Sequence, residues 1–208
     1  MGKIAMRIKL IVSVVCILFI QSVFSQAQWE VDMVRNINPN PPSSNFWGNI
    51  SSTTGIIAVG VPSSMLLVSI INHDKKLQKQ SIVVLGSLAI ATVTTQLLKQ
   101  VVNRPRPYES YSDIYPDVYE SGKSFPSGHT TIAFSTAASL TLITKKWYVA
   151  VPAFAWASSV AYSRMYLGQH YPSDLMMGAA IGTASAFASQ WIMKKITVKK
   201  KETVKQLP

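Results

Sequence analysis

The chain reads GIIAVGVPSSMLLVSII at residues 55–71, NHDKKLQKQ at 72–80 and SIVVLGSLAIATVTTQLL at 81–98. Two apolar runs therefore flank one short basic turn. A helix needs about 17–25 residues to span a bilayer, and the two runs fall in this range. The stretch predicts a hairpin of two membrane helices, although runs of this length also fit the buried helices of a soluble protein.

Three further apolar runs follow at residues 130–144, 147–163 and 175–193. Several are rich in Ser, Thr, Ala and Gly, which let helices approach closely inside a membrane bundle. Charged residues make up only 14% of the 208 residues, where soluble domains have about 25%. We therefore expect an all-α fold, a polytopic membrane bundle of five or six transmembrane helices.

The basic residues between the runs support this fold. If alternate connections lie on opposite sides of a membrane, one side holds 14 of the 20 Lys and Arg residues. Cytoplasmic loops carry this excess, so that side should be cytoplasmic. Tryptophans at the ends of the runs suit the headgroup layers. The formal charge of +11 lies in short clusters and not on one basic face, so we expect no nucleic-acid partner.

The connections assigned to the outer side carry a group of residues suited to an anion. They are Lys99, Arg106-Pro107, Pro126-Ser127-Gly128-His129, Ser163-Arg164, His170 and Asp174. Arginine offers a planar fork to two oxygens, and lysine a compact charge. Gly128 allows close approach of the backbone, Ser127 adds a hydroxyl, and the helix that begins near His129 presents free N–H groups. Such a set can stabilise the charge of a transferring phosphoryl group.

The pattern resembles the signature of the type 2 phosphatidic acid phosphatase superfamily, K-x6-R-P, P-S-G-H and S-R-x5-H-x3-D. All three parts match in order over residues 99–174. The resemblance implies that His170 attacks phosphorus and forms a phosphohistidine, and that Asp174 orients its ring. It also implies that His129 protonates the leaving group and then activates water. The family needs no metal, and we expect no cofactor.

The resemblance also implies a phosphatase that acts on a lipid phosphate or diphosphate. Candidates are phosphatidylglycerophosphate, a polyprenyl diphosphate, phosphatidic acid and a lipid A phosphate. A general acid phosphatase or a vanadate-haloperoxidase-like enzyme anchored in the membrane is one alternative. A non-catalytic protein that binds or transports lipid phosphate is another, although mere binding needs no nucleophile.

The chain divides into four parts. Residues 1–25 are a signal peptide or an uncleaved first transmembrane helix, and 26–49 an extracytoplasmic interfacial segment. Residues 50–193 form the phosphatase membrane domain, and 194–208 a basic cytoplasmic tail. We expect a multi-pass protein of a bacterial-type inner membrane, with its active site facing the extracytoplasmic side and a phosphorylated membrane lipid as its partner.

Two segments near the motifs leave their roles open. Residues Trp29, Met33, Val34 and Ile37 recur at helical spacing, which fits a helix on the membrane surface or an ordered linker. The loop at 107–122 interleaves tyrosines with acidic residues. It is either a wet interfacial loop or a cover that selects headgroups at the pocket mouth. Arg104 lies outside the signature, and we expect at most a backbone or headgroup contact.

Overall fold

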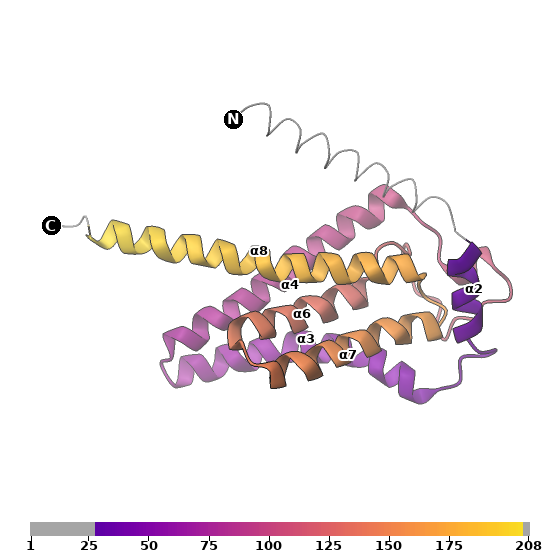
Figure 1. Cartoon of the computed structure of the whole chain (residues 1–208), viewed down its shortest axis with the longest axis horizontal. Coiled ribbons are helices and arrows are strands. Elements are labelled where there is room, and N and C mark those ends of the chain that lie inside the picture. The colour runs from indigo at the N-terminus through magenta and orange to yellow at the C-terminus, as the bar shows by residue number, and fades with distance from the viewer. Residues whose placement is uncertain (1–27, 206–208) are drawn as a thin grey trace, which may run out of the picture.

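The computed structural model describes residues 28–205, with side chains up to residue 198, so the expected signal or first helix at 1–25 lies outside the described residues. Throughout this range the regular elements are helices, which confirms the all-α fold (Figure 1). They are α2 (Gln28–Ile37), α3 (Asn45–Ile71), α4 (Lys75–Val102), α5 (Pro107–Ser110), α6 (Gly128–Thr144), α7 (Trp147–Tyr166) and α8 (Pro172–Lys205).

Each predicted apolar run lies inside one of the five long helices α3, α4, α6, α7 and α8, and several of these helices extend beyond their runs. Helix α3 begins ten residues before its apolar run, and α8 continues to Lys205, into the segment expected as a tail. These polar extensions carry no periodicity that would distinguish them from loops. Among the described residues, the stretches Asn45–Ile71 and Lys75–Ser110 are long and apolar enough to cross a membrane.

Helix α6 is the centre of the bundle and contacts α3, α4, α7 and α8. Its buried side chains are small, namely Thr130, Thr131, Ala133, Ser135, Thr136, Ala137, Ala138 and Ser139. Large apolar side chains instead point outward, among them Ile56, Val59, Val93, Val151 and Phe187. Small residues inside and large apolar ones outside are what a bundle surrounded by lipid requires.

Two glycines set the separation of α6 and α8. A Cβ atom at Gly178 would lie 2.9 Å from the carbonyl oxygen of Ser127. One at Gly182 would lie 2.7 Å from the backbone nitrogen of Ser135. Neither position accepts a side chain without displacing the backbone of α6. The backbones of the two helices can therefore approach this closely only because both residues are glycine.

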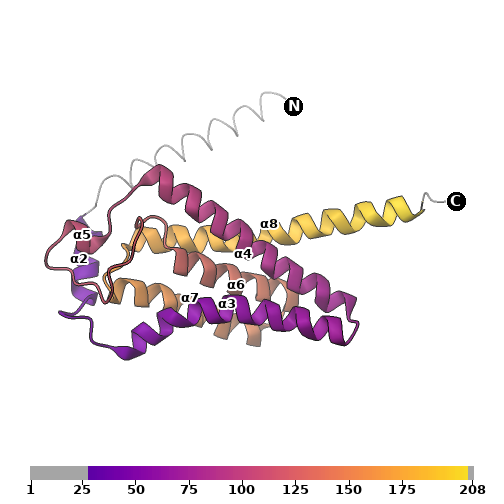
Figure 2. The same ribbon diagram turned by 180° about the vertical axis from the view of Figure 1, so that it is seen from behind.

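Helix α2 lies across one end of the bundle, next to α5 and the loop that follows it (Figure 2). Its inward face is Glu30, Val31 and Val34, all buried. The predicted helix is present; within its stripe Val34 is buried, whereas Trp29 and Met33 are 53% and 40% exposed, as a helix on a membrane surface allows. The hydrophobic pattern could not reveal that a carboxylate takes a place on the buried face.

Candidate active site

The predicted site residues come from the ends of four helices and two connecting loops at the end of the bundle that carries α2 (Figure 2). Lys99 lies in the last turn of α4 and Arg164 in the last turn of α7. His129 and Asp174 lie in the first turns of α6 and α8. The fold therefore brings together residues that are up to 75 positions apart in the sequence.

His170 and Asp174 form a buried pair. The Nδ1 atom of His170 lies 3.5 Å from Oδ2 of Asp174, and both side chains are almost fully buried. The same oxygen accepts hydrogen bonds from the hydroxyl of Ser124 and, at 2.9 Å, from the backbone N–H of Tyr171. Burial lowers the pKa of His170 to about 3, although Asp174 acts in the opposite direction. The ring is therefore neutral at neutral pH, and a proton on Nδ1 leaves Nε2 free as a nucleophile.

Arg106 and Arg164 both hold the carboxylate of Glu120. Nη2 of Arg106 lies 3.0 Å from one oxygen, and Nη2 of Arg164 pairs with the other. Burial alone would raise the pKa of Glu120, but the two guanidinium groups, Arg164 above all, lower it to about 2. Sequence reasoning missed this residue, because nothing in the 107–122 loop distinguishes Glu120 from its acidic neighbours.

Lys99 and His129 belong to the same cluster. Nζ of Lys99 donates a hydrogen bond to the carbonyl of Lys123. His129 is half-buried and interacts electrostatically with Arg164, Glu120, Arg106 and Lys99. The structure thus places both histidines and all three predicted cations at one site.

Ser127 joins the first turns of α6 and α8. Its hydroxyl accepts a hydrogen bond from the backbone N–H of Thr130 at 3.4 Å and caps α6. Its own N–H donates to the carbonyl of Asp174 at 3.1 Å. A Cβ atom at Gly128 would meet nothing within 4 Å, so packing between protein groups does not require glycine there. The space beside Gly128 remains open to a ligand.

The expectation for Arg104 was wrong. This side chain is buried, and its Nη1 donates to Oδ1 of Asp174 at 2.8 Å. Its Nη2 donates to Oε2 of Glu30, also at 2.8 Å. Glu30 was not predicted at all. An acidic residue beside two buried valines on α2 was the available signal, but the sequence does not show which cation would neutralise it.

The 107–122 loop is anchored on the site at a few points, while much of it lies at the surface, with Val118 61% and Tyr119 81% exposed. Ile114 is buried against Val31, Val34 and Tyr171. Farther along the loop, the carbonyl of Val118 accepts a hydrogen bond from Nε2 of Gln169 at 2.7 Å. The loop therefore covers the cluster, while its selection of headgroups stays a prediction.

The residues within 28–198 include no group of three or more His, Cys, Asp or Glu that could hold a metal ion.

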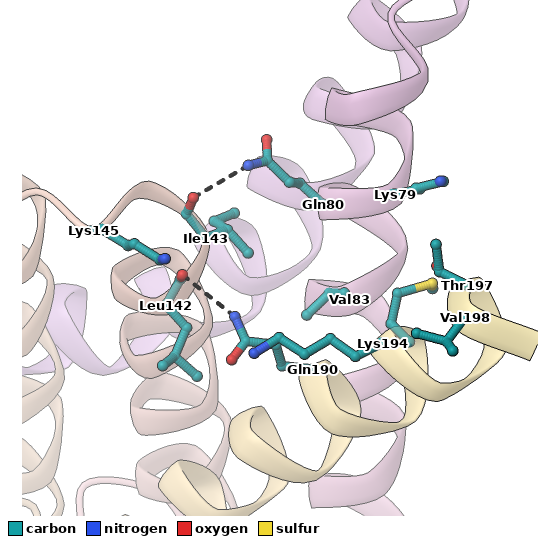
Figure 3. Close-up of a pocket in the computed structure, with 11 residues that line it drawn as sticks. Lys79, Gln80, Val83, Leu142, Ile143, Lys145, Gln190, Lys194, Thr197 and Val198 are labelled. Carbon is teal, nitrogen blue, oxygen red and sulfur yellow. Dashed lines mark hydrogen bonds between the residues drawn. The ribbon is translucent and has the colours of Figure 1, made fainter. Parts of the chain in front are cut away.

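A cavity of about 490 Å³ opens at the other end of the bundle, between α4, α6 and α8. Figure 3 shows Lys79, Lys145 and Lys194 around it. Nε2 of Gln80 and Nε2 of Gln190 donate there to the carbonyls of Ile143 and Leu142. Its lining holds no histidine or carboxylate, so it is not part of the His–Asp site.

Comparison with known families matches residues 80–197 to the PAP2 superfamily. The chain is 30% identical to lipid A 4'-phosphatase of Bacteroides thetaiotaomicron over 166 residues, which cover 75% of this chain and 74% of the relative. It is 32% identical to undecaprenyl-diphosphatase of Sulfolobus acidocaldarius, with 62% of each chain covered. Phosphatidylglycerophosphatase B of Bacillus subtilis is 30% identical, with 69% of this chain and 74% of the relative covered.

Two solved structures resemble the fold. The crystal structure of Aquifex aeolicus LpxE superimposes with a TM-score of 0.64 and 26% identity, over 76% of this chain and 93% of that one. The transmembrane PAP2 type phosphatidylglycerolphosphate phosphatase of Bacillus subtilis gives a TM-score of 0.67 at 21% identity, over 86% of this chain and 92% of that one. The second likeness concerns the fold alone.

Proposed function

This chain belongs to the PAP2 superfamily and is a lipid phosphatase, and we propose that it works through a phosphohistidine at His170. The observation that carries the assignment of residues is the buried His170–Asp174 pair in one cluster with Arg106 and Arg164. A neutral imidazole beside several cations is equipped to attack an anionic phosphorus centre.

The first step forms the phosphoenzyme. The lone pair on Nε2 of His170 attacks phosphorus while the bond from phosphorus to the lipid oxygen breaks. Burial lowers the pKa of His129 to about 4 in the free site, and the negative charge of a bound phosphate favours its protonated form, which donates a proton to the departing oxygen. The ring of His170 becomes positively charged, and its Nδ1–H donates to Asp174, which stabilises that charge.

The second step regenerates the enzyme. His129, now neutral, removes a proton from a water molecule, and the resulting oxygen attacks the phosphorus on His170. The nitrogen–phosphorus bond breaks, its electron pair returns to Nε2, and inorganic phosphate leaves. Each group therefore ends the cycle in the protonation state in which it began.

Lys99, Arg106 and Arg164 would stabilise the charge on the phosphoryl oxygens in both steps. Arg106 and Arg164 now pair with Glu120, so a phosphate has to replace this carboxylate on the same donors. Nε of Arg164 is buried and has no hydrogen-bond partner among the described residues. A phosphate oxygen would satisfy it, which supports Arg164 as a phosphate ligand.

The relatives are named for lipid A, undecaprenyl diphosphate and phosphatidylglycerophosphate, which share a phosphate held at a lipid headgroup. We expect kcat/KM for long-chain phosphatidic acid to exceed that for glycerol 3-phosphate by at least about 100-fold, or about 2.7 kcal/mol. Chains anchored in the bilayer hold the phosphate in register for attack, an advantage that a soluble ester lacks.

Phosphate release by the purified protein in detergent measures this preference, with chelator present and with a panel of the other lipid phosphates. Equal rates on the lipid and the soluble ester would indicate a general acid phosphatase that is merely anchored in the membrane. Binding of lipid phosphate without release would indicate the non-catalytic alternative.

We propose further that the site faces the extracytoplasmic side of the inner membrane. The opposite end of the bundle carries Lys79, Lys145 and Lys194, as cytoplasmic ends do. Lys79 and Lys99 lie 20 residues apart on α4, or about 30 Å, which is the thickness of the hydrocarbon core.

Cysteine labelling tests this orientation in a variant without Cys16. Tyr119→Cys, at a side chain that is 81% exposed near the site, should react with an impermeant thiol reagent added to intact cells. Asn72→Cys, in the turn between α3 and α4, should react only after lysis. The opposite pattern would place the site, and its substrate, on the cytoplasmic side.

A further inference from the structure

A chain of three buried charged side chains lies behind the nucleophile. Glu30 of α2 accepts a hydrogen bond from Arg104, Arg104 donates to Asp174, and Oδ2 of Asp174 lies 3.5 Å from Nδ1 of His170. The side chains of Glu30, Arg104 and Asp174 are each at most 3% exposed. Screening by solvent is weak at such depth, so the charge of each member acts on the next.

Further contacts fix this chain in place. Nη1 of Arg104 also donates to the hydroxyl of Ser173 at 2.7 Å, and its guanidinium lies 4.0 Å from the ring centre of Tyr171. The second oxygen of Glu30 accepts the N–H of Ser173 at 2.9 Å, in the first turn of α8. Glu30 thus holds both Arg104 and the backbone that carries Asp174.

The sum of the charges gives Glu30 its importance. Arg104 and Asp174 alone would cancel, and a neutralised Asp174 would do little for a positive ring on His170. With Glu30 the three groups carry one net negative charge. That negative charge stabilises the positive charge that His170 gains when it is phosphorylated.

We infer that Glu30 and Arg104 are positioning residues that set the orientation and the effective charge of Asp174 towards His170. The inference rests on the phosphohistidine mechanism proposed above. Glu30 precedes residues 80–197, the part that matches the family. Helix α2 therefore contributes to catalysis from outside the matched region and is not only a cover.

Other charges face the same pair from the elements around it. Arg164 of α7 and Arg106 of the loop before α5 disfavour a positive charge on His170, while Lys99 of α4 interacts with Asp174. These cations are the same in every variant below. Changes in the pH dependence can therefore be assigned to Glu30 and Arg104.

The experiment is a double-mutant cycle with Glu30→Gln, Arg104→Gln and the combined variant, assayed on phosphatidic acid from pH 3 to 8. Arg104→Gln removes a positive charge near His170, so the acidic limb of kcat/KM should move up by about 1–3 pH units. Adding Glu30→Gln removes a negative charge and should move it back by about one unit or more. Glu30→Gln alone should lower kcat about tenfold or more, with KM within about twofold, by analogy with residues that hold a metal-ligating histidine in place, whose replacement commonly has effects of this size.

A merely structural pair predicts a different result. Both single variants would then lower the melting temperature, with the acidic limb unmoved or moved in the same direction, and this would overturn the inference. Asp32→Asn is the matched control, since Asp32 is an exposed carboxylate on the same helix. It should leave both the rate and the pH profile as in the wild type.

If a glutamine variant does not fold, Arg104→Lys keeps the charge and should keep the acidic limb, whereas a moved limb would contradict the inference. Titration of the histidine side-chain NMR signals in the same proteins needs no substrate. The chain has three histidines, and His73 is exposed, so His170 can be assigned with His170→Ala. A wild type inactive on every lipid phosphate would refute the proposed function, while opposite shifts of the His170 signal in the two variants would still support the charge effect.

Discussion

Replacing His170 by alanine is expected to lower kcat by at least about 10,000-fold, because no nitrogen–phosphorus bond can then form. Loss of a nucleophile in an enzyme that works through a covalent intermediate has effects of this order or larger. The change removes a fully buried ring, so some loss of stability accompanies it. Phosphate release under single-turnover conditions measures the chemical step directly.

His73→Asn is the matched control, since His73 lies in the turn between α3 and α4 with a positive φ of 54°, which asparagine accepts readily. It should leave the rate unchanged. Labelled phosphate should remain on the wild-type protein after a rapid quench in alkali and should be absent from His170→Ala. An alanine variant that folds and retains full activity would refute the assignment of the nucleophile.

Replacing Arg164 by lysine should lower kcat/KM by about 100- to 1,000-fold, although the charge is kept. Loss of one donor to a charge that develops in the transition state commonly costs this much. Arg164 is buried, with Nη1 on the hydroxyl of Ser51 and Nη2 on Glu120. Lysine has one ammonium group on a flexible stem and cannot reproduce the planar fork.

Arg35→Lys is the corresponding control, because Arg35 pairs with Asp113 at an exposed site of α2 and such pairs contribute little. Vanadate inhibition separates the two possible effects of Arg164→Lys. Weaker inhibition together with a lower rate means that Arg164 holds the phosphoryl oxygens. A normal rate with a lowered melting temperature would mean that it only joins α7 to α3 and the loop.

The sequence predicted the fold and the His–Asp–cation cluster because each depends on a local pattern. Apolar runs and basic turns mark the helices, and the three motifs sit at helix ends that must meet at one side of a bundle. Glu120 and Glu30 depend instead on contacts across 44 and 74 positions, from Glu120 to Arg164 and from Glu30 to Arg104. No spacing rule joins such residues, and a buried carboxylate resembles an exposed one until its partner is known.

Gly178 and Gly182 of α8 set the distance between α6 and α8, because a side chain at either position would meet the backbone of α6. Gly178 lies one turn after Asp174 and against Ser127, which immediately precedes Gly128 and His129. The start of α6, and with it the position of His129, therefore depends on the absence of a side chain at Gly178. A family member that enlarges this glycine has to shift the start of α6, and with it the reach of His129. A change in the packing of α8 against α6 is therefore also a change in the site.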